Sequence, residues 1–404
     1  MQGARVIVAF RGKRGMANQD TLFDTLIDRA DSPSIKWGRY QRADIISFGT
    51  ADMDFQSPAC IRDALIRKAE SGLYAYEYKT ESYYQAITDW FSHHHNWAVQ
   101  PQWLTNCPGM WAMLALCLRA YTAPGDGVLI HAPHFHPAIS VIEGAERKVV
   151  TQALSFDGVR YRFDPQQFED IIVRQKVTLF FLVNPHNPTG LMFSRTELGV
   201  IADICERHNV TVVSDEINSY LTYDNASFVP YGSISSASSR HSVTLTSPSK
   251  AFNLQGLTYA IGIIPNAVKW QQLEKIRTGM DFDFASNIFS LTATEAAYRH
   301  GSAWLTRLND YLQGNLDFMD NYLQANLPQI KLFRPGGGYI AWLDFRSFRL
   351  TPEELRDRIL EKAKIGMTWG ETFGPEGEGF ERLNFACPRA RLAEGLERIK
   401  RAFS

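Results

Sequence analysis

Short, continuously apolar runs alternate along this chain with longer amphipathic segments. The apolar runs lie at residues 128–130, 177–183, 210–213, 243–245 and 259–264. Runs of this kind are typical of strands buried on both faces, as in a parallel sheet. Helical periodicity separates them, for example over residues 110–121 and 196–207. The alternation predicts an α/β fold with a mostly parallel sheet flanked by helices.

The pattern changes near residue 300. In order, it shows a helix (304–327), a strand after three glycines (339–345), a second helix (351–363), a Gly-rich loop (366–379) and a last strand that includes Arg382. These elements predict a smaller α+β domain. We expect a large domain at residues 66–300 and a small domain at 301–404, to which residues 19–65 add an N-terminal part. Residues 1–18 are expected to be either an arm or an over-extended start, with Met16 as an alternative first residue, and to have no function in either case.

Segments with polar residues follow four of the apolar runs. The segment 131–137, which contains three histidines and Phe135, follows the first run, Asn187 lies in the turn after the second, Asp215 follows the third, and Lys250 comes shortly after the fourth. In open α/β sheets, ligands bind beyond the carboxyl ends of the strands. The sequence therefore predicts a binding site at this edge of the sheet.

Composition narrows the class of protein. Hydrophobic residues make up 45% of the 404 residues, charged residues 21%, and the net charge is -1. These values are typical of a folded globular protein and give no general attraction to nucleic acid or to a membrane surface. No apolar window reaches the length of a membrane span. Five scattered cysteines predict neither a disulfide framework nor a zinc site, and they favour a cytoplasmic location.

The run His93–His95 resembles a metal site only superficially. Consecutive residues on a helix point in different directions, so three histidines in a row seldom bind one ion. We therefore expect no metal, and we interpret this run as the solvated end of a helix.

The residues at the predicted sheet edge suit pyridoxal 5′-phosphate (PLP). This cofactor needs an amine for a Schiff base, and Lys250 at a buried strand end supplies one. It needs an acid beneath the pyridinium nitrogen, which Asp215 provides. Asn187 is expected to donate a hydrogen bond to the phenolic O3′ of the ring, and Phe135 to stack on the ring face.

The phosphate of PLP needs hydrogen-bond donors. Free N–H groups at a helix start bind anions, and the helix expected over 110–121 begins directly after Gly109. Gly109 and Met110 are therefore predicted to bind the phosphate. Ser247 and Ser249 add hydroxyl donors near Lys250.

Four motifs resemble those of a known family. They are residues 51–55 (ADMDF), 184–190 (NPHNPTG), 249–253 (SKAFN) and 382–389 (RLNFACPR). Together they resemble fold-type I PLP enzymes of the class I/II aminotransferase superfamily. Within it, the chain is most similar to the MalY/PatB-type cystathionine β-lyases, or C–S lyases. The resemblance spans residues 20–400.

The resemblance implies further site residues. Arg382 matches the arginine that binds the substrate α-carboxylate, with Arg389 as the alternative, and Ala51 borders the substrate. Tyr76 matches a tyrosine that reaches the cofactor phosphate of the partner subunit. A homodimer with two shared active sites is implied as well.

Several positions depart from the family pattern. Asn218 stands where the superfamily has Tyr and this branch has His, so it can donate to O3′ but cannot titrate. Thr258 replaces an arginine that binds phosphate in aminotransferases, and MalY/PatB proteins also tend to lack that arginine. Gly338 and Trp369 replace Thr and Pro, which leaves the substrate side chain open.

The expected activity is a PLP-dependent carbon–sulfur β-lyase. It would act on cystathionine or a related S-substituted cysteine and release a thiol, pyruvate and ammonia. Two alternatives remain: an aminotransferase of an L-amino acid, and a specialised biosynthetic eliminase or cyclase. A binding protein without turnover is disfavoured by the intact Lys250, Asp215 and Arg382.

Overall fold

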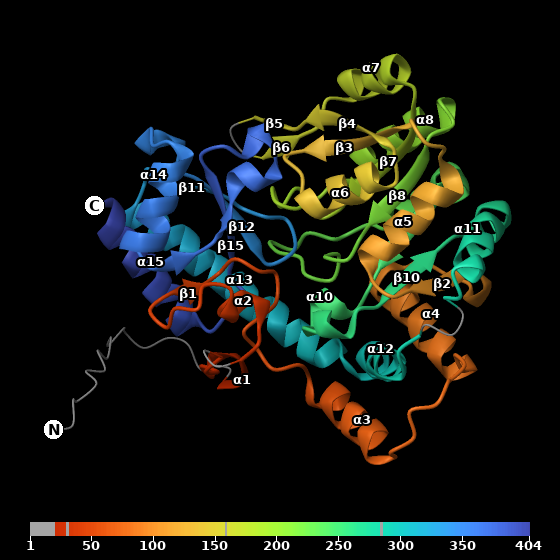
Figure 1. Ribbon diagram of the computed structural model, residues 1–404, viewed down its shortest axis with the longest axis horizontal. Helices are drawn as coiled ribbons and strands as arrows, with labels where there is room; N and C mark the ends of the chain where they lie inside the picture. The colour runs from red at the N-terminus through yellow and green to blue at the C-terminus, as the bar shows by residue number, and fades with distance from the viewer. Residues whose placement is uncertain (1–20, 30–31, 158–159, 283–285) are drawn as a thin grey trace.

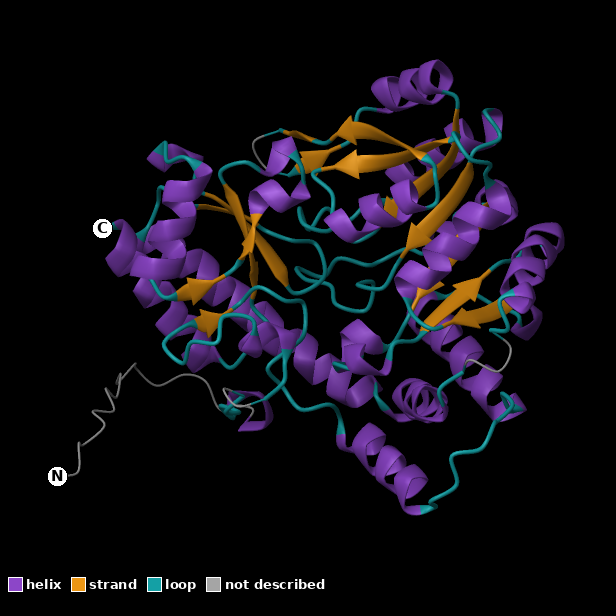
Figure 2. Cartoon of the chain, in the orientation of Figure 1, coloured by secondary structure: helices purple, strands orange, loops and turns teal. Residues whose placement is uncertain are grey.

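A seven-stranded sheet forms the centre of the fold (Figures 1 and 2). The computed structural model describes residues 21–29, 32–157, 160–282 and 286–404, so the expected arm at 1–18 lies outside the described residues. From edge to edge the strands are β2 (Leu104–Cys107), β10 (Ala260–Ile263), β9 (Ser242–Thr246), β8 (Thr211–Asp215), β7 (Val177–Val183), β3 (Gly127–Ala132) and β4 (Lys148–Ala153). Four of the six neighbouring pairs are parallel, which confirms the predicted α/β fold.

Four of the five apolar runs coincide with parallel strands, but the run at 259–264 does not. It contains β10, which is antiparallel to both of its neighbours. A continuously apolar pattern reports burial on both faces, and β10 is buried along its whole length whatever its direction. The pattern also missed β2, which is short and contains two polar residues, and β4, an edge strand with alternate residues exposed.

Helices cover both faces of this sheet, because successive strand residues point to opposite sides. Phe181 of β7 belongs to the apolar cluster that includes residues of α5 (Met110–Tyr121), α6 (His136–Gly144) and α11 (Ala267–Gly279). Its neighbour Phe180 belongs to the cluster that includes residues of α7 (Pro165–Gln175) and α8 (Arg195–Arg207). The sheet is thus the middle of three layers. The bounds of α5 match the prediction, and α8 begins one residue earlier than expected.

A second, smaller sheet lies toward the C-terminus. Its strands are antiparallel, in the order β11 (Lys331–Phe333), β12 (Ile340–Asp344), β15 (Phe380–Asn384) and β14 (Thr368–Trp369). The helices beside it in sequence are α13 (Ser302–Asn326), α14 (Pro352–Asp357) with a π-helical turn over Arg358–Lys362, and α15 (Arg389–Phe403). The expected loop at 366–379 is partly wrong, because it contains β14 and the end of β13 (Ile365–Gly366). β13 pairs in parallel with β1 (Ile46–Ser47), so residues far apart in sequence lie side by side.

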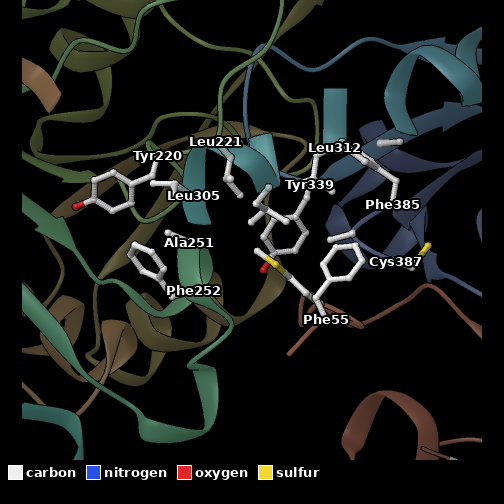
Figure 3. Close-up of a cluster of buried hydrophobic side chains, with 14 of the residues drawn as sticks. Phe55, Tyr220, Leu221, Ala251, Phe252, Leu305, Leu312, Tyr339, Phe385 and Cys387 are labelled. Carbon is white, nitrogen blue, oxygen red and sulfur yellow. The ribbon is translucent and has the colours of Figure 1, made fainter. Parts of the chain in front are cut away.

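A buried cluster joins α13 to the short helix α10 (Ser249–Phe252), which carries Lys250 (Figure 3). Leu305 and Leu312 of α13 lie in the same cluster as Ala251 and Phe252 of α10. Both residues after Lys250 are therefore packed in the core. The core thus sets the orientation of the short helix that presents the lysine.

The remaining elements are α1 (Thr21–Asp24), α2 (Ile35–Gly38), α3 (Ala59–Glu70), α4 (Glu81–His95), β5 (Ser155–Phe156), β6 (Tyr161–Arg162), α9 (Ser236–His241) and α12 (Ile288–His300). The expected solvated helix end at His93–His95 is only partly right. His95 turns inward against Tyr220 and Phe228, and burial lowers its pKa to about 4. None of the helices in the described ranges is both long enough and apolar enough to cross a membrane.

A buried cluster of charges ties the N-terminal residues to the ADMDF motif. The carboxylate of Asp54 forms ion pairs with Lys36 (3.2 Å), Arg29 (3.2 Å) and Arg391 (3.2 Å). It also accepts a hydrogen bond from Trp37 Nε1 at 3.0 Å. Burial by itself would raise the pKa of Asp54, but the charges of Lys36 and Arg391 outweigh burial and hold that pKa below its usual value. Asp54 is therefore the ionic centre of this region.

Replacing Asp54 is expected to destabilise the protein. The side chain of Lys36 is fully buried, and Asp54→Ala leaves its ammonium group without its carboxylate partner. Breaking one side of a buried ion pair costs about 3–5 kcal/mol. Urea denaturation followed by circular dichroism measures the change. The matched control is Asp44→Ala, which removes an exposed ion pair with Arg42 and is expected to leave the denaturation midpoint unchanged. Equal midpoints for the two variants would contradict this assignment.

Candidate active site

A cavity of about 440 Å³ opens at the carboxyl edge of the large sheet. Its lining combines residues of the large sheet, of the small sheet and of the N-terminal segment, residues 39–51. Ten of the residues predicted from sequence line it: Ala51, Gly109, Met110, Phe135, Asn187, Asp215, Asn218, Ser249, Lys250 and Arg382. Among the described residues, no group of His, Cys, Asp and Glu side chains is arranged to hold a metal ion.

Strand register brings the central residues together. Val183 at the end of β7 pairs with Asp215 of β8, and Asp215 pairs with Leu245 of β9. The backbone continues this alignment past the strands, because Asn184 N donates to Asp215 O at 2.9 Å. The segments that follow these strands therefore begin at the same edge, and they carry Asn187 and Lys250.

Lys250 lies at the centre of the cavity lining. Its Nζ donates a hydrogen bond to Ala51 O at 2.8 Å. Burial lowers its pKa to about 8, and the charge of Arg382 lowers it further, whereas Asp52 and Asp215 act in the opposite direction. With this pKa, about a tenth of the amine is neutral at pH 7, far more than for a lysine with the ordinary pKa of about 10.4. A neutral amine is the form that reacts with an aldehyde.

Asp215 supplies a buried carboxylate close enough to Lys250 for their charges to interact. One of its oxygens, Oδ1, accepts from Ile217 N at 3.1 Å. Burial raises its pKa to about 6, against the opposing effects of that hydrogen bond and of Lys250. A buried carboxylate of this kind gains stability from a cationic partner, such as a protonated ring nitrogen.

The start of α5 forms an anion cradle. Gly109 is the N-cap residue and offers no side chain to the free N–H groups of the first turn. Gly109, Met110 and Trp111 all line the cavity, so these N–H groups lie at its wall. Gly109 has a φ of 105°, a conformation that other residues rarely adopt. This geometry suits a phosphate.

Arg382 is buried and held in a fixed orientation. Its guanidinium donates to Asn187 Oδ1 at 3.1 Å, to Gly49 O at 2.9 Å and to Thr368 Oγ1 at 3.1 Å. It also lies over the ring of Phe135, 5.2 Å from the centroid. Because the oxygen of the Asn187 side chain accepts from Arg382, its NH₂ group remains available as a donor. The alternative residue, Arg389, does not line the cavity and instead binds Asn315 Oδ1.

Two predicted residues lie outside this cavity. Ser247 is fully buried, and its Oγ accepts a hydrogen bond from Ser249 N at 3.2 Å, so it shapes the turn before Lys250. Tyr76 is 83% exposed and does not line the cavity of its own chain. The predicted contacts of both residues with a phosphate remain predictions. Asn218 and Gly338 both depart from the family pattern. Asn218 lines the cavity, and Gly338 lies beside it, because a Cβ at 338 would lie 3.7 Å from that of Asn218.

Sequence reasoning missed several lining residues. Among them are Arg39, Thr50, Trp111, His134, Gln255, Tyr339 and Thr368. The carbonyl of Ala51 accepts not only from Lys250 but also from Tyr339 Oη at 2.7 Å and Gln255 Nε2 at 3.2 Å. The three glycines before Tyr339 were a usable signal, because they allow a close approach of that segment to the sheet edge. For Arg39, the local pattern gave no signal.

These residues fit PLP. The cavity places a buried amine with a lowered pKa, a buried carboxylate and an anion cradle around one space. Asp215 Oδ1 accepts a hydrogen bond from Ile217 N. Arg382 binds the side-chain oxygen of Asn187 and not its NH₂ group. With helices on both faces of a mostly parallel sheet, this arrangement defines an α/β enzyme of the fold-type I PLP class.

Comparisons with known proteins agree with this class. The family model for aminotransferase class I and II matches residues 43–399. Cystathionine beta-lyase PatB of Bacillus subtilis is 36% identical over 388 residues, which cover 95% of this chain and 100% of PatB. Protein MalY of Escherichia coli is 32% identical and covers 93% of this chain and 96% of its own length. The crystal structure of cystalysin from Treponema denticola, which contains pyridoxal 5′-phosphate, has a TM-score of 0.89, with 28% identity, and covers 94% of this chain and 98% of its own.

The chain belongs to the class I and II aminotransferase family. This confirms the resemblance that its four motifs indicated. Enzymes of this family use PLP, and the chain keeps the lysine, aspartate and asparagine that match the family motifs.

The lowered pKa of Lys250 predicts how the cofactor-free protein takes up PLP. Only the neutral amine reacts, so the rate of uptake is expected to rise with pH through a midpoint near 8. An ordinary lysine would give a midpoint of about 10.4. Stopped-flow measurement of the visible absorbance band between pH 6.5 and 10 tests this. Lys250→Ala is the control and is expected to form no such band, and a midpoint at the ordinary value would contradict the role of burial.

Proposed function

We propose that this chain is a PLP-dependent carbon–sulfur β-lyase acting on cystathionine or another S-substituted cysteine. The overall reaction consumes water and releases a thiol, pyruvate and ammonia. Its main support is the combination of the Lys250–Asp215 site with end-to-end similarity to PatB, a cystathionine beta-lyase. When bound, PLP supplies an aldehyde for the substrate amine and a ring that stabilises negative charge at the substrate Cα.

The chain's own residues have separate roles. Lys250 holds the cofactor in the resting enzyme and removes the proton from the substrate Cα as a general base. Its pKa of about 8 suits this role, because a base works best when its pKa lies near the working pH. Asp215 keeps a proton on the ring nitrogen through a buried ionic contact. Tyr339 and Gln255 donate hydrogen bonds to Ala51 O, which also accepts the hydrogen bond from Lys250 Nζ.

Substrate orientation comes from the small-sheet side of the cavity. Arg382 is the donor for the α-carboxylate, since its planar guanidinium suits bidentate pairing with a carboxylate. Its contacts with Asn187, Gly49 and Thr368 fix the plane of the guanidinium. A carboxylate bound there keeps the substrate Cα within reach of residues at the sheet edge. Phe135 and Trp111, which follow from the large sheet, contact each other where they line the cavity, and their rings would exclude water there.

The second candidate is an aminotransferase, because the family model carries that name and removal of the Cα proton is common to both reactions. The two functions differ in their need for a second substrate. An aminotransferase requires a 2-oxo acid acceptor, whereas a β-lyase requires only the amino acid and water.

The β-lyase activity is expected to appear with cystathionine or S-methyl-L-cysteine alone. Pyruvate is measured with lactate dehydrogenase and the thiol with a disulfide reagent, and the two should form in equal amounts without a 2-oxo acid. Lys250→Ala is expected to lower the rate by about 10³-fold or more, because it removes the general base.

The matched control is Lys331→Ala, which changes an exposed lysine of β11 and is expected to leave the rate unchanged. Absence of pyruvate from every S-substituted cysteine, despite bound PLP, would exclude the lyase. Product formation that depends on a 2-oxo acid would favour the aminotransferase.

We further propose a homodimer with two shared active sites. In this assembly Tyr76 reaches the phosphate in the partner subunit, and residues 19–65 and 301–404 form a small domain beside a large domain at 66–300. Exposed apolar side chains around Tyr76 support an interface there, namely Leu73, Tyr74 and Tyr78. We place the enzyme in the cytoplasm, supported by five cysteines without a disulfide.

Subunit mixing tests the shared site. Tyr76→Ala is expected to lower kcat/KM about tenfold or more, because a hydrogen bond to a charged group is lost. A hybrid of Tyr76→Ala and Lys250→Ala subunits should regain activity, since one of its two sites combines an intact Lys250 with an intact Tyr76. The control pair uses Lys331→Ala in place of Tyr76→Ala, because Lys331 is exposed on β11, is not part of the apolar group around Tyr76 and should not lower activity by itself. A Tyr76→Ala enzyme that is not rescued by mixing would contradict the shared site.

A further inference from the structure

Arg39 lies at the opening of the active-site cavity. It lines the same space as Lys250 and Arg382, yet its side chain is exposed. It follows directly after α2, and Figure 1 shows α2 beside the small sheet, whereas α5 lies over the large sheet. The phosphate cradle at the start of α5 is thus on another wall of the cavity.

The backbone around Arg39 is firmly held. On one side, Lys36 donates to Asp52 O at 3.0 Å and pairs with Asp54 in the buried charge cluster. On the other side, Tyr40 Oη donates to Met367 O at 3.4 Å. Met367 precedes Thr368, which accepts from Arg382. These contacts fix Arg39 at the cavity wall that also carries Arg382.

Within the described residues, Arg39 forms no ion pair or hydrogen bond through its side chain. The three aspartates between residues 40 and 54 are all engaged elsewhere. Asp44 pairs with Arg42 and Lys364, Asp52 with Arg29, and Asp54 with three other cations. Arg382, in contrast, is held by three acceptors. The cavity therefore carries a second guanidinium with which no carboxylate of the described ranges pairs.

We infer that Arg39 binds an anionic group at the far end of the substrate. The inference rests on the proposed function, in which Arg382 takes the α-carboxylate, and it places the sulfur substituent toward the opening. A carboxylate on the departing thiol would meet Arg39 there. The substrate class is thus an S-substituted cysteine whose substituent ends in a carboxylate, as opposed to a simple S-alkyl cysteine. A guanidinium suits this role because it pairs with a carboxylate through two parallel hydrogen bonds.

A matched substrate pair tests the inference. S-(3-carboxypropyl)-L-cysteine and its terminal amide have nearly the same shape but differ in charge. The unmodified holoenzyme is expected to favour the carboxylate about fivefold to tenfold in kcat/KM, mainly through KM, because this contact is made equally in the ground state and the transition state. Arg39→Gln should reduce this ratio to about one, and Arg39→Lys should keep part of it.

Two further variants make the test decisive. Arg195→Gln changes an exposed arginine that does not line the cavity, and it should keep the full ratio. Arg39→Glu should favour S-(4-aminobutyl)-L-cysteine over the amide, because the charge at the opening is reversed. Equal ratios in the unmodified enzyme and Arg39→Gln would overturn the inference. Absence of pyruvate from all of these compounds would overturn the β-lyase function itself, so the two failures are distinguishable.

Discussion

The electrostatic contact between the buried carboxylate of Asp215 and the amine of Lys250 is the constraint on which the site depends. Burial shifts their pKa values toward each other, to about 6 for Asp215 and about 8 for Lys250. Neither shift would arise at a protein surface, because water would solvate both charges. The parallel register of β8 with β7 and β9 makes this burial possible, because it aligns the strand ends at one edge. The sheet thus positions the amine and the carboxylate, and the burial that it provides also shifts their pKa values.

The small sheet and the N-terminal segment supply the cavity-lining residues that the large sheet does not. Arg382 on β15 donates to Asn187 through Nη1 and to Gly49 and Thr368 through Nη2, whereas its buried Nε has no partner among the described residues. The carbonyl oxygen of Ala51 accepts hydrogen bonds from Lys250, Gln255 and Tyr339, which lie in different parts of the chain. Such contacts make the geometry of the cavity depend on the relative position of the two sheets. The charge cluster around Asp54 holds the N-terminal side of this arrangement.

The family motifs and the departures from them lie in different parts of the site. Lys250, Asp215 and Asn187 lie at the large sheet edge, and under the proposed function they would serve any reaction that begins by removing a proton from Cα. Two of the positions that depart from the family are neighbours: Asn218 lines the cavity, and Gly338 lies beside it. Arg39 also lines the cavity, and no described carboxylate pairs with it. Under the two proposals, selectivity would depend on segments outside the motifs that define the family.

The sequence by itself determined the fold class, most of the parallel strands and ten residues of the cavity. It could do so because burial on both faces leaves a continuous apolar run, and because polar residues at strand ends mark a binding edge. Only the tertiary structure decided the direction of β10, the edge strand β4, the inward position of His95 and the choice of Arg382 over Arg389. It also revealed Arg39, Gln255 and Tyr339 at the site. These features depend on contacts between segments up to hundreds of residues apart, which leave no periodicity in the local sequence.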